Sequence, residues 1–120
     1  MSFNPLDEVK YRYRLAVEQL GRAERLFSLE DWVGTVSSSQ SAVENFAKAV
    51  IASFEVPTWS HDPSNQLSSL IERLPGGLSE DAQRLAVMVR EMAPEHGRSS
   101  YGEPSAGLTP SDIYREGHAS

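Results

Sequence analysis

Four side chains that could handle phosphate lie within 12 residues of the chain: Arg90, His96, Arg98 and Tyr101. An arginine can hold phosphate oxygens through a forked pair of hydrogen bonds, and a histidine can move a proton near neutral pH. The group therefore predicts a phosphate-binding site at His96, Arg98 and Tyr101. A solvated loop is the more common origin of such a group, because an arginine and a histidine at this spacing often occur by chance.

A second candidate is a run of small polar residues at positions 37–41 (SSSQS), which includes Ser39 and Gln40. Serine is a mediocre helix former because its hydroxyl competes for backbone hydrogen bonds. The run indicates either a close approach of two helices or one wall of a polar groove. Such a groove would bind a nucleotide through Ser39 and Gln40, or a partner subunit.

A third set consists of Trp59, His61 and Asp62. The carboxylate of Asp62 could orient the imidazole of His61, as in many acid–base sites. Packing of the three side chains over the ends of helices is the more common arrangement, and we expect that one here.

The elements that must position these residues are predicted to be helices. Asn4 is a good helix cap and Pro5 suits a first helical turn. Apolar residues then recur every three or four positions, which is typical of one buried helical face. This first stripe consists of Leu6, Val9, Tyr13, Ala16, Leu20, Ala23 and Phe27.

A second long helix follows after a short link. Ser28 and Asp31 resemble a capping box, and the helix is expected to end near Phe54 because Pro57 follows. Two long helices with so short a link must lie antiparallel, stripe against stripe. The second stripe consists of Trp32, Val36, Ser39, Val43, Phe46 and Val50.

The second half of the chain predicts shorter elements. One helix runs from Ser64 to about Leu74, and another is capped by Ser79 and ends before Pro94. Residues 94–110 contain three prolines and three glycines and are predicted to be irregular.

A final short helix is expected to begin after Thr109, where a cap, a proline and an acidic residue follow one another. The predicted fold is an all-α antiparallel helical bundle of four to five helices, two long and two or three short. It forms a single domain over residues 4–116.

Composition excludes several classes of function. The 120 residues contain 11 Lys and Arg against 17 Asp and Glu, and this net charge of −6 argues against a general nucleic-acid coat. The chain has no cysteine, and its three histidines lack a metal-ligand spacing, so neither a metal nor a cofactor is expected. No apolar run approaches the length of a membrane span, and a cytoplasmic protein is expected.

Residues 31–49 read D-W-x7-Q-S-A-V-E-N-F-A-K-A. This is similar to the G-D-(W/Y)…Q-Q-A-x-E-K-x-x-K-A signature of HEPN domains (higher eukaryotes and prokaryotes nucleotide-binding domains). Residues 59–62 (WSHD) resemble the T-H-(D/S)-L segment of this family, and residues 109–112 (TPSD) resemble its T-x-E-D-A segment. The resemblance covers about residues 5–115.

The resemblance implies a module that binds a nucleotide or an RNA phosphate, and that could act beside a separately encoded minimal nucleotidyltransferase. An alternative is the metal-independent ribonuclease branch of the family, whose R-x(4–6)-H motif matches Arg90 and His96. There His96 would act as general base and Arg90 would stabilise the developing charge. Pro94 and Glu91 lie within this motif and favour the binding module.

The resemblance also implies a homodimer in which the late-helix motifs of two copies face each other. Arg90 lies about 150° from the centre of its helix's apolar stripe, which is compatible with such an interface. A helical dimerisation module without a ligand is the third interpretation.

Overall fold

The computed structural model describes residues 4–115, and within them the regular structure is helical. The β-structure within residues 4–115 consists of one isolated antiparallel bridge between Glu103 and Leu108. The prediction of an all-α antiparallel bundle is confirmed. The α-helices are α1 (Pro5–Ser28), α2 (Trp32–Ala52), α3 (Ser64–Leu70), α4 (Gly76–Met92), α5 (Glu95–Tyr101) and α6 (Pro110–Ile113), and 3₁₀ turns cover Ile71–Arg73 and Pro104–Ala106.

The two long helices form an antiparallel hairpin, as predicted. The Asn4 side chain accepts hydrogen bonds from the backbone N–H groups of Leu6 and Asp7 and so caps α1. The cap of α2 is Asp31, whose carboxylate accepts from the backbone N–H of Gly34 at 2.9 Å. The expected pairing of Ser28 with Asp31 is wrong, because the Ser28 hydroxyl instead donates to a carbonyl within α1.

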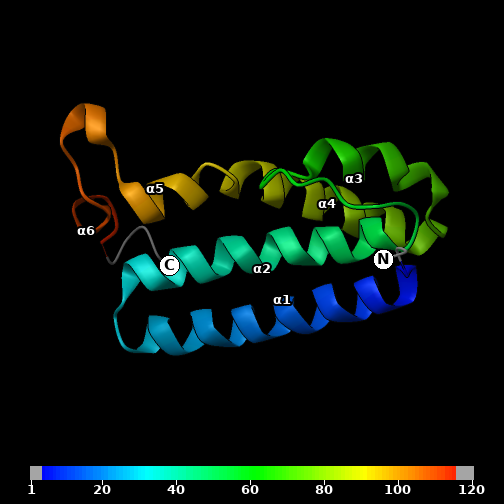
Figure 1. Ribbon diagram of the computed structural model, residues 1–120, viewed down its shortest axis with the longest axis horizontal. Coiled ribbons are helices and arrows are strands. Elements are labelled where there is room, and N and C mark those ends of the chain that lie inside the picture. The colour runs from blue at the N-terminus through cyan, green and yellow to red at the C-terminus, as the bar shows by residue number, and fades with distance from the viewer. Residues whose placement is uncertain (1–3, 116–120) are drawn as a thin grey trace.

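Helix α2 lies in the middle of the molecule, with α1 on one side and α3, α4 and α5 on the other (Figure 1). The apolar core lies on this second side, where Ile51, Leu67 and Val89 meet from α2, α3 and α4. Because neighbours cover α2 on several sides, its buried residues are not restricted to the predicted stripe. They include Ser38, Gln40, Glu44, Asn45 and Lys48.

Helix α1 is less covered than its stripe predicted. Within α1, as far as the structure describes it, only Ala16 and Ala23 are buried. The extensive contacts of this helix are with α2. These alanines lie at the contact with α2 and leave the larger residues of the predicted stripe on the flank. Exposed members of that stripe are Leu6, Tyr13, Leu20 and Phe27.

Two boundaries in the second half differ from the prediction. Helix α4 begins at Gly76, directly after Pro75, so the Pro-Gly-Gly sequence starts this helix and Ser79 does not cap it. Residues 95–101, predicted to be irregular, form α5. Pro94 does end α4, but a proline is compatible with the start of a new helix, where its missing N–H is not needed.

The start of α6 is as predicted. The side chain of Asp112 accepts hydrogen bonds from the backbone N–H and the hydroxyl of Thr109, both at 2.9 Å. The backbone hydrogen bond, followed by the hydroxyl, lowers the pKa of Asp112 below its usual value. None of the helices within residues 4–115 is both long and apolar enough to cross a bilayer.

Gly102 ends α5, and Gly107 ends the 3₁₀ turn that follows it. Both have positive φ, +72° and +69°. A Cβ on Gly102 would collide with the carbonyl oxygen of Leu108, whereas one on Gly107 would meet nothing within 4 Å. We expect Gly107→Ala to cost about 1 kcal/mol through the left-handed backbone conformation, and Gly102→Ala to cost clearly more. Urea unfolding followed by circular dichroism measures both, and equal losses would contradict the collision.

Candidate functional site

Three polar residues form a row on the buried side of α2: Gln40, Glu44 and Lys48, each four positions from the next. The Lys48 ammonium lies 3.0 Å from Oε2 of Glu44, and the Gln40 amide donates to Oε1 of the same carboxylate at 2.8 Å. Burial removes these groups from water, so the carboxylate depends on its protein donors.

Two histidines from distant parts of the chain stack on each other beside this row. The rings of His61 and His96 are 3.6 Å apart between centroids, with planes inclined by 21°. Nδ1 of His61 lies 3.1 Å from Oε1 of Glu44, and Nδ1 of His96 lies 3.4 Å from Oε1 of Gln40. With the protons on Nδ1, both rings donate to α2 and keep Nε2 for another partner.

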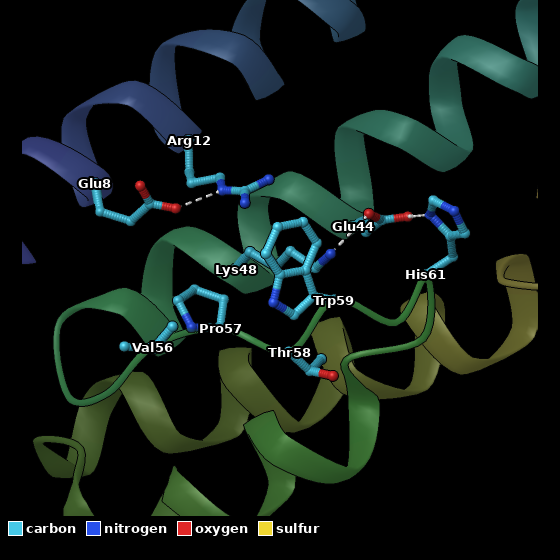
Figure 2. A pocket seen from close by; sticks show the side chains of 9 residues that line it. All are labelled: Glu8, Arg12, Glu44, Lys48, Val56, Pro57, Thr58, Trp59 and His61. Carbon is cyan, nitrogen blue, oxygen red and sulfur yellow. Dashed lines mark hydrogen bonds and ion pairs between the residues drawn. The ribbon is translucent and has the colours of Figure 1, made fainter. Parts of the chain in front are cut away.

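A cavity of about 490 Å³ adjoins His61, between the α1–α2 hairpin and the segment that follows α2 (Figure 2). Trp59 is 97% exposed, although its side chain lines this cavity. We call this the Trp59 cavity, and its lining consists of Glu8, Arg12, Glu44, Lys48, Val56, Pro57, Thr58, Trp59 and His61.

Two cationic side chains line the Trp59 cavity, and each is paired with a carboxylate of its own helix. Lys48 pairs with Glu44 on α2, and Nε of Arg12 lies 2.8 Å from Oε1 of Glu8 on α1. Arg12 also donates to the side-chain oxygen of Asn45 at 2.9 Å. The formal charges of these four lining groups cancel, so the cavity is polar without being strongly electropositive.

Arg90 lies on the exposed side of α4, as predicted, and it contacts the beginning of α3. Its Nε donates to the Ser64 hydroxyl and its Nη2 to the Asn65 side-chain oxygen, both at 3.3 Å. His61 precedes Ser64 by three residues and stacks on His96. Arg90 and His96, the two members of the R-x(4–6)-H motif, lie on separate helices. Residues 61–65 contact both of them and so connect them.

Arg98 has carboxylate partners within the chain. Its Nη1 lies 2.8 Å from Glu95 and its Nε 2.9 Å from Glu103, and the Glu95 charge is the main cause that raises the pKa of Arg98. Tyr114 donates to Glu95 as well, and burial is the main cause that raises the pKa of Tyr114. These contacts join α5 to the C-terminal segment.

The other candidate residues are spread over the molecule. Tyr101 is exposed at the end of α5, and Ser39 is half-buried on a different side of α2 from Gln40. Asp62 accepts a hydrogen bond from the backbone N–H of Ser64 at 3.0 Å, and the partner of His61 is Glu44. The structure therefore brings Gln40 and His96 together, but not Ser39, Arg98 and Tyr101.

Sequence reasoning did not single out Glu44, Lys48 and Arg12. A signal for the first two was available, because they are the only charged residues in the 21 residues of α2. No group of three or more histidine, aspartate or glutamate side chains within residues 4–115 is arranged to hold a metal ion.

The buried ion pair can be tested by removing one charge at a time. Lys48→Met leaves the Glu44 carboxylate without its ammonium, and Glu44→Gln leaves that ammonium unpaired. Each should lower the free energy of unfolding by about 3 kcal/mol, and the double variant should lose clearly less than the sum. Arg84→Ala, which removes an exposed α4 pair with Glu80 and Asp81, should cost less than about 0.5 kcal/mol in the same urea titration. Additive losses for Lys48 and Glu44 would show that the pair is not coupled.

Comparison with known proteins gives a match to the HEPN domain family model over residues 9–112. No curated protein and no solved structure matches the chain significantly. The matched region includes most of α1, the polar row of α2, both stacked histidines and the start of α6. Because it covers most of the 120 residues, the protein belongs to the HEPN domain family.

Proposed function

We propose that this HEPN domain binds a single nucleotide, or one or two nucleotides of a single-stranded RNA, in the Trp59 cavity. The observation that carries the proposal is the 97% exposure of Trp59 at a cavity that also contains Lys48 and Arg12. An indole so exposed is a platform for a nucleobase, and stacking of this kind contributes about 1–3 kcal/mol per base.

The charges of the chain favour a short ligand. A surface that follows a nucleic-acid backbone needs many unpaired cations, whereas this chain has a net charge of −6. Lys48 and Arg12 are the two cations that line the cavity, and a ligand phosphate must compete there with Glu44 and Glu8. Affinity should therefore come from base stacking together with one or two phosphate contacts.

Tryptophan fluorescence tests this directly, because Trp32 and Trp59 are the two tryptophans of the chain. In Trp32→Phe, Trp59 is the sole reporter, and titration with adenosine monophosphate or a short oligoadenylate should quench it. Trp59→Ala should lose about 10-fold in affinity, since stacking contributes about 1–3 kcal/mol. Unchanged Trp59 emission at saturating nucleotide would remove the cavity from consideration.

The dependence on salt provides a second test. With Lys48 and Arg12 as the only phosphate contacts, the slope of log K against log salt should be about −1.4 or shallower for a single strand. A steeper slope would place the RNA on a surface other than the Trp59 cavity.

A metal-independent ribonuclease is the second candidate, and the stacked histidines are the observation that favours it. Two adjacent imidazoles with Nε2 available could supply a base for the ribose 2′-hydroxyl and an acid for the departing 5′-oxygen. In this scheme His96 takes the first proton, His61 gives the second, and Arg90 stabilises the charge on the phosphorane. Glu44 positions His61 in this reaction, and the products are a 2′,3′-cyclic phosphate and a 5′-hydroxyl.

Cleavage of a single-stranded RNA with metal chelated tests this second function. His96→Ala and Arg90→Ala should each reduce the rate at least 100-fold, the usual contribution of an acid–base or charge-stabilising group. Arg84→Ala, which removes another exposed cation of α4, should leave the rate unchanged. Binding that persists without any cleavage would leave the first proposal standing and reject the second.

A further inference from the structure

Helix α1 carries a line of large apolar side chains on its flank. Leu6, Tyr13, Leu20 and Phe27 follow one another at intervals of seven residues and are between 43% and 61% exposed. Helix α1 is 24 residues long, or about 36 Å, and it forms one edge of the molecule beside α2 (Figure 1). A row of this length on an outer helix is a typical protein–protein contact surface.

The residues next to this line complete a coiled-coil pattern. Lys10, Val17 and Glu24 are also exposed and also seven residues apart, and each follows a member of the first line by four positions. Apolar positions that alternate at intervals of four and three residues form the seam of a two-helix coiled coil. We call these seven residues the α1 seam.

The charges in the α1 seam identify its partner. Lys10 and Glu24 lie seven residues before and after Val17, and neither forms an ion pair with another residue of the described chain. A two-fold axis through Val17, perpendicular to α1, would place Lys10 of each copy opposite Glu24 of the other. A parallel arrangement would instead place like charges together.

We infer that the α1 seam binds the α1 seam of a second copy of this chain in antiparallel orientation. The apolar line is nearly symmetric about the same axis, so that Leu6 faces Phe27 of the second copy and Tyr13 faces Leu20. One surface thus matches itself in the order of both its apolar and its charged residues, which a two-fold interface requires.

A neighbouring groove extends this surface. It has a volume of about 520 Å³, and Val9 and Tyr13 of α1 form one edge of it. Apolar side chains from α2 and α4, among them Phe46, Val50 and Leu78, form most of the remainder, and Ser53 and Leu74 complete it. A second copy seated on α1 would cover the edge of this groove, which increases the apolar area removed from water.

The inferred interface is independent of the proposed ligand site. Glu8 and Arg12 of α1 line the Trp59 cavity, whereas the α1 seam lies on another flank of the same helix. Arg90 and His96 lie beyond α2, on α4 and α5 (Figure 1). The inference therefore predicts a dimer that differs from the late-helix interface implied by the sequence resemblance.

Sedimentation of the full chain at micromolar concentrations tests the inference. The unaltered protein should be a dimer, and Leu20→Glu should be monomeric with unchanged helicity. Val87→Glu is the matched control, because Val87 is an exposed apolar residue of α4 outside the seam, and it should remain dimeric. A monomeric native protein, or a Leu20→Glu variant that still dimerises, would overturn the inference.

Charge exchange tests the orientation. Lys10→Glu and Glu24→Lys should each weaken the dimer at least 10-fold, since both place like charges opposite each other. The double variant should recover the affinity of the native chain. Failure of the double variant to recover would reject the antiparallel pairing.

Cysteine trapping gives an independent result, because the chain has no cysteine of its own. A mixture of Lys10→Cys and Glu24→Cys copies should form a disulfide under mild oxidation, whereas Lys10→Cys alone should not. Crosslinking of Lys10→Cys with itself would instead indicate parallel helices, and a crosslink in neither sample would reject the seam as an interface. Nucleotide binding by the Leu20→Glu monomer would show separately that the Trp59 cavity does not depend on this dimer.

Discussion

The buried carboxylate of Glu44 is the centre of the polar network that holds the segment after α2 and helix α5 to α2. It accepts hydrogen bonds from Lys48 and Gln40 on its own helix, and His61 reaches it from the segment after α2. A carboxylate removed from water without such donors would cost several kcal/mol, so its partners must be in place when the chain folds. His96 then joins through Gln40. The segment after α2 and helix α5 are thus both held to α2 by one polar network.

Helix α1 is attached in a different way. Ala16 and Ala23 lie buried at the contact with α2, and small side chains allow the two helices to approach closely. Hydrogen bonds add to this helix–helix contact, since the Asn45 side chain of α2 accepts one from Arg12 and donates one to Gln19 of α1. A narrow contact leaves both flanks of α1 open. One flank contributes to the Trp59 cavity and the other carries the α1 seam, so a single helix serves two surfaces without conflict.

Local signals in the sequence predict the start of α1 and the start of α6, because caps act over three or four residues. They predict the start of α2 only in part, since Asp31 caps it without Ser28. They do not predict α5, since Pro94 and Gly97 both disfavour a helix interior. In the structure Pro94 lies before the helix and Gly97 within it, where packing of α5 against α2 outweighs the glycine. The stacking of His61 on His96 joins positions 35 residues apart, and no spacing rule can anticipate it. It depends on the path of the segment between α2 and α3.

The charge balance of the Trp59 cavity limits how it can bind an anion, because each cation that lines it is already paired with a carboxylate. A phosphate at Lys48 would compete with Glu44, which then keeps its negative charge beside the phosphate unless another cation compensates. Gln40 and His61 would remain as hydrogen-bond partners of Glu44, because the Gln40 amide donates to it and Nδ1 of His61 lies 3.1 Å from it.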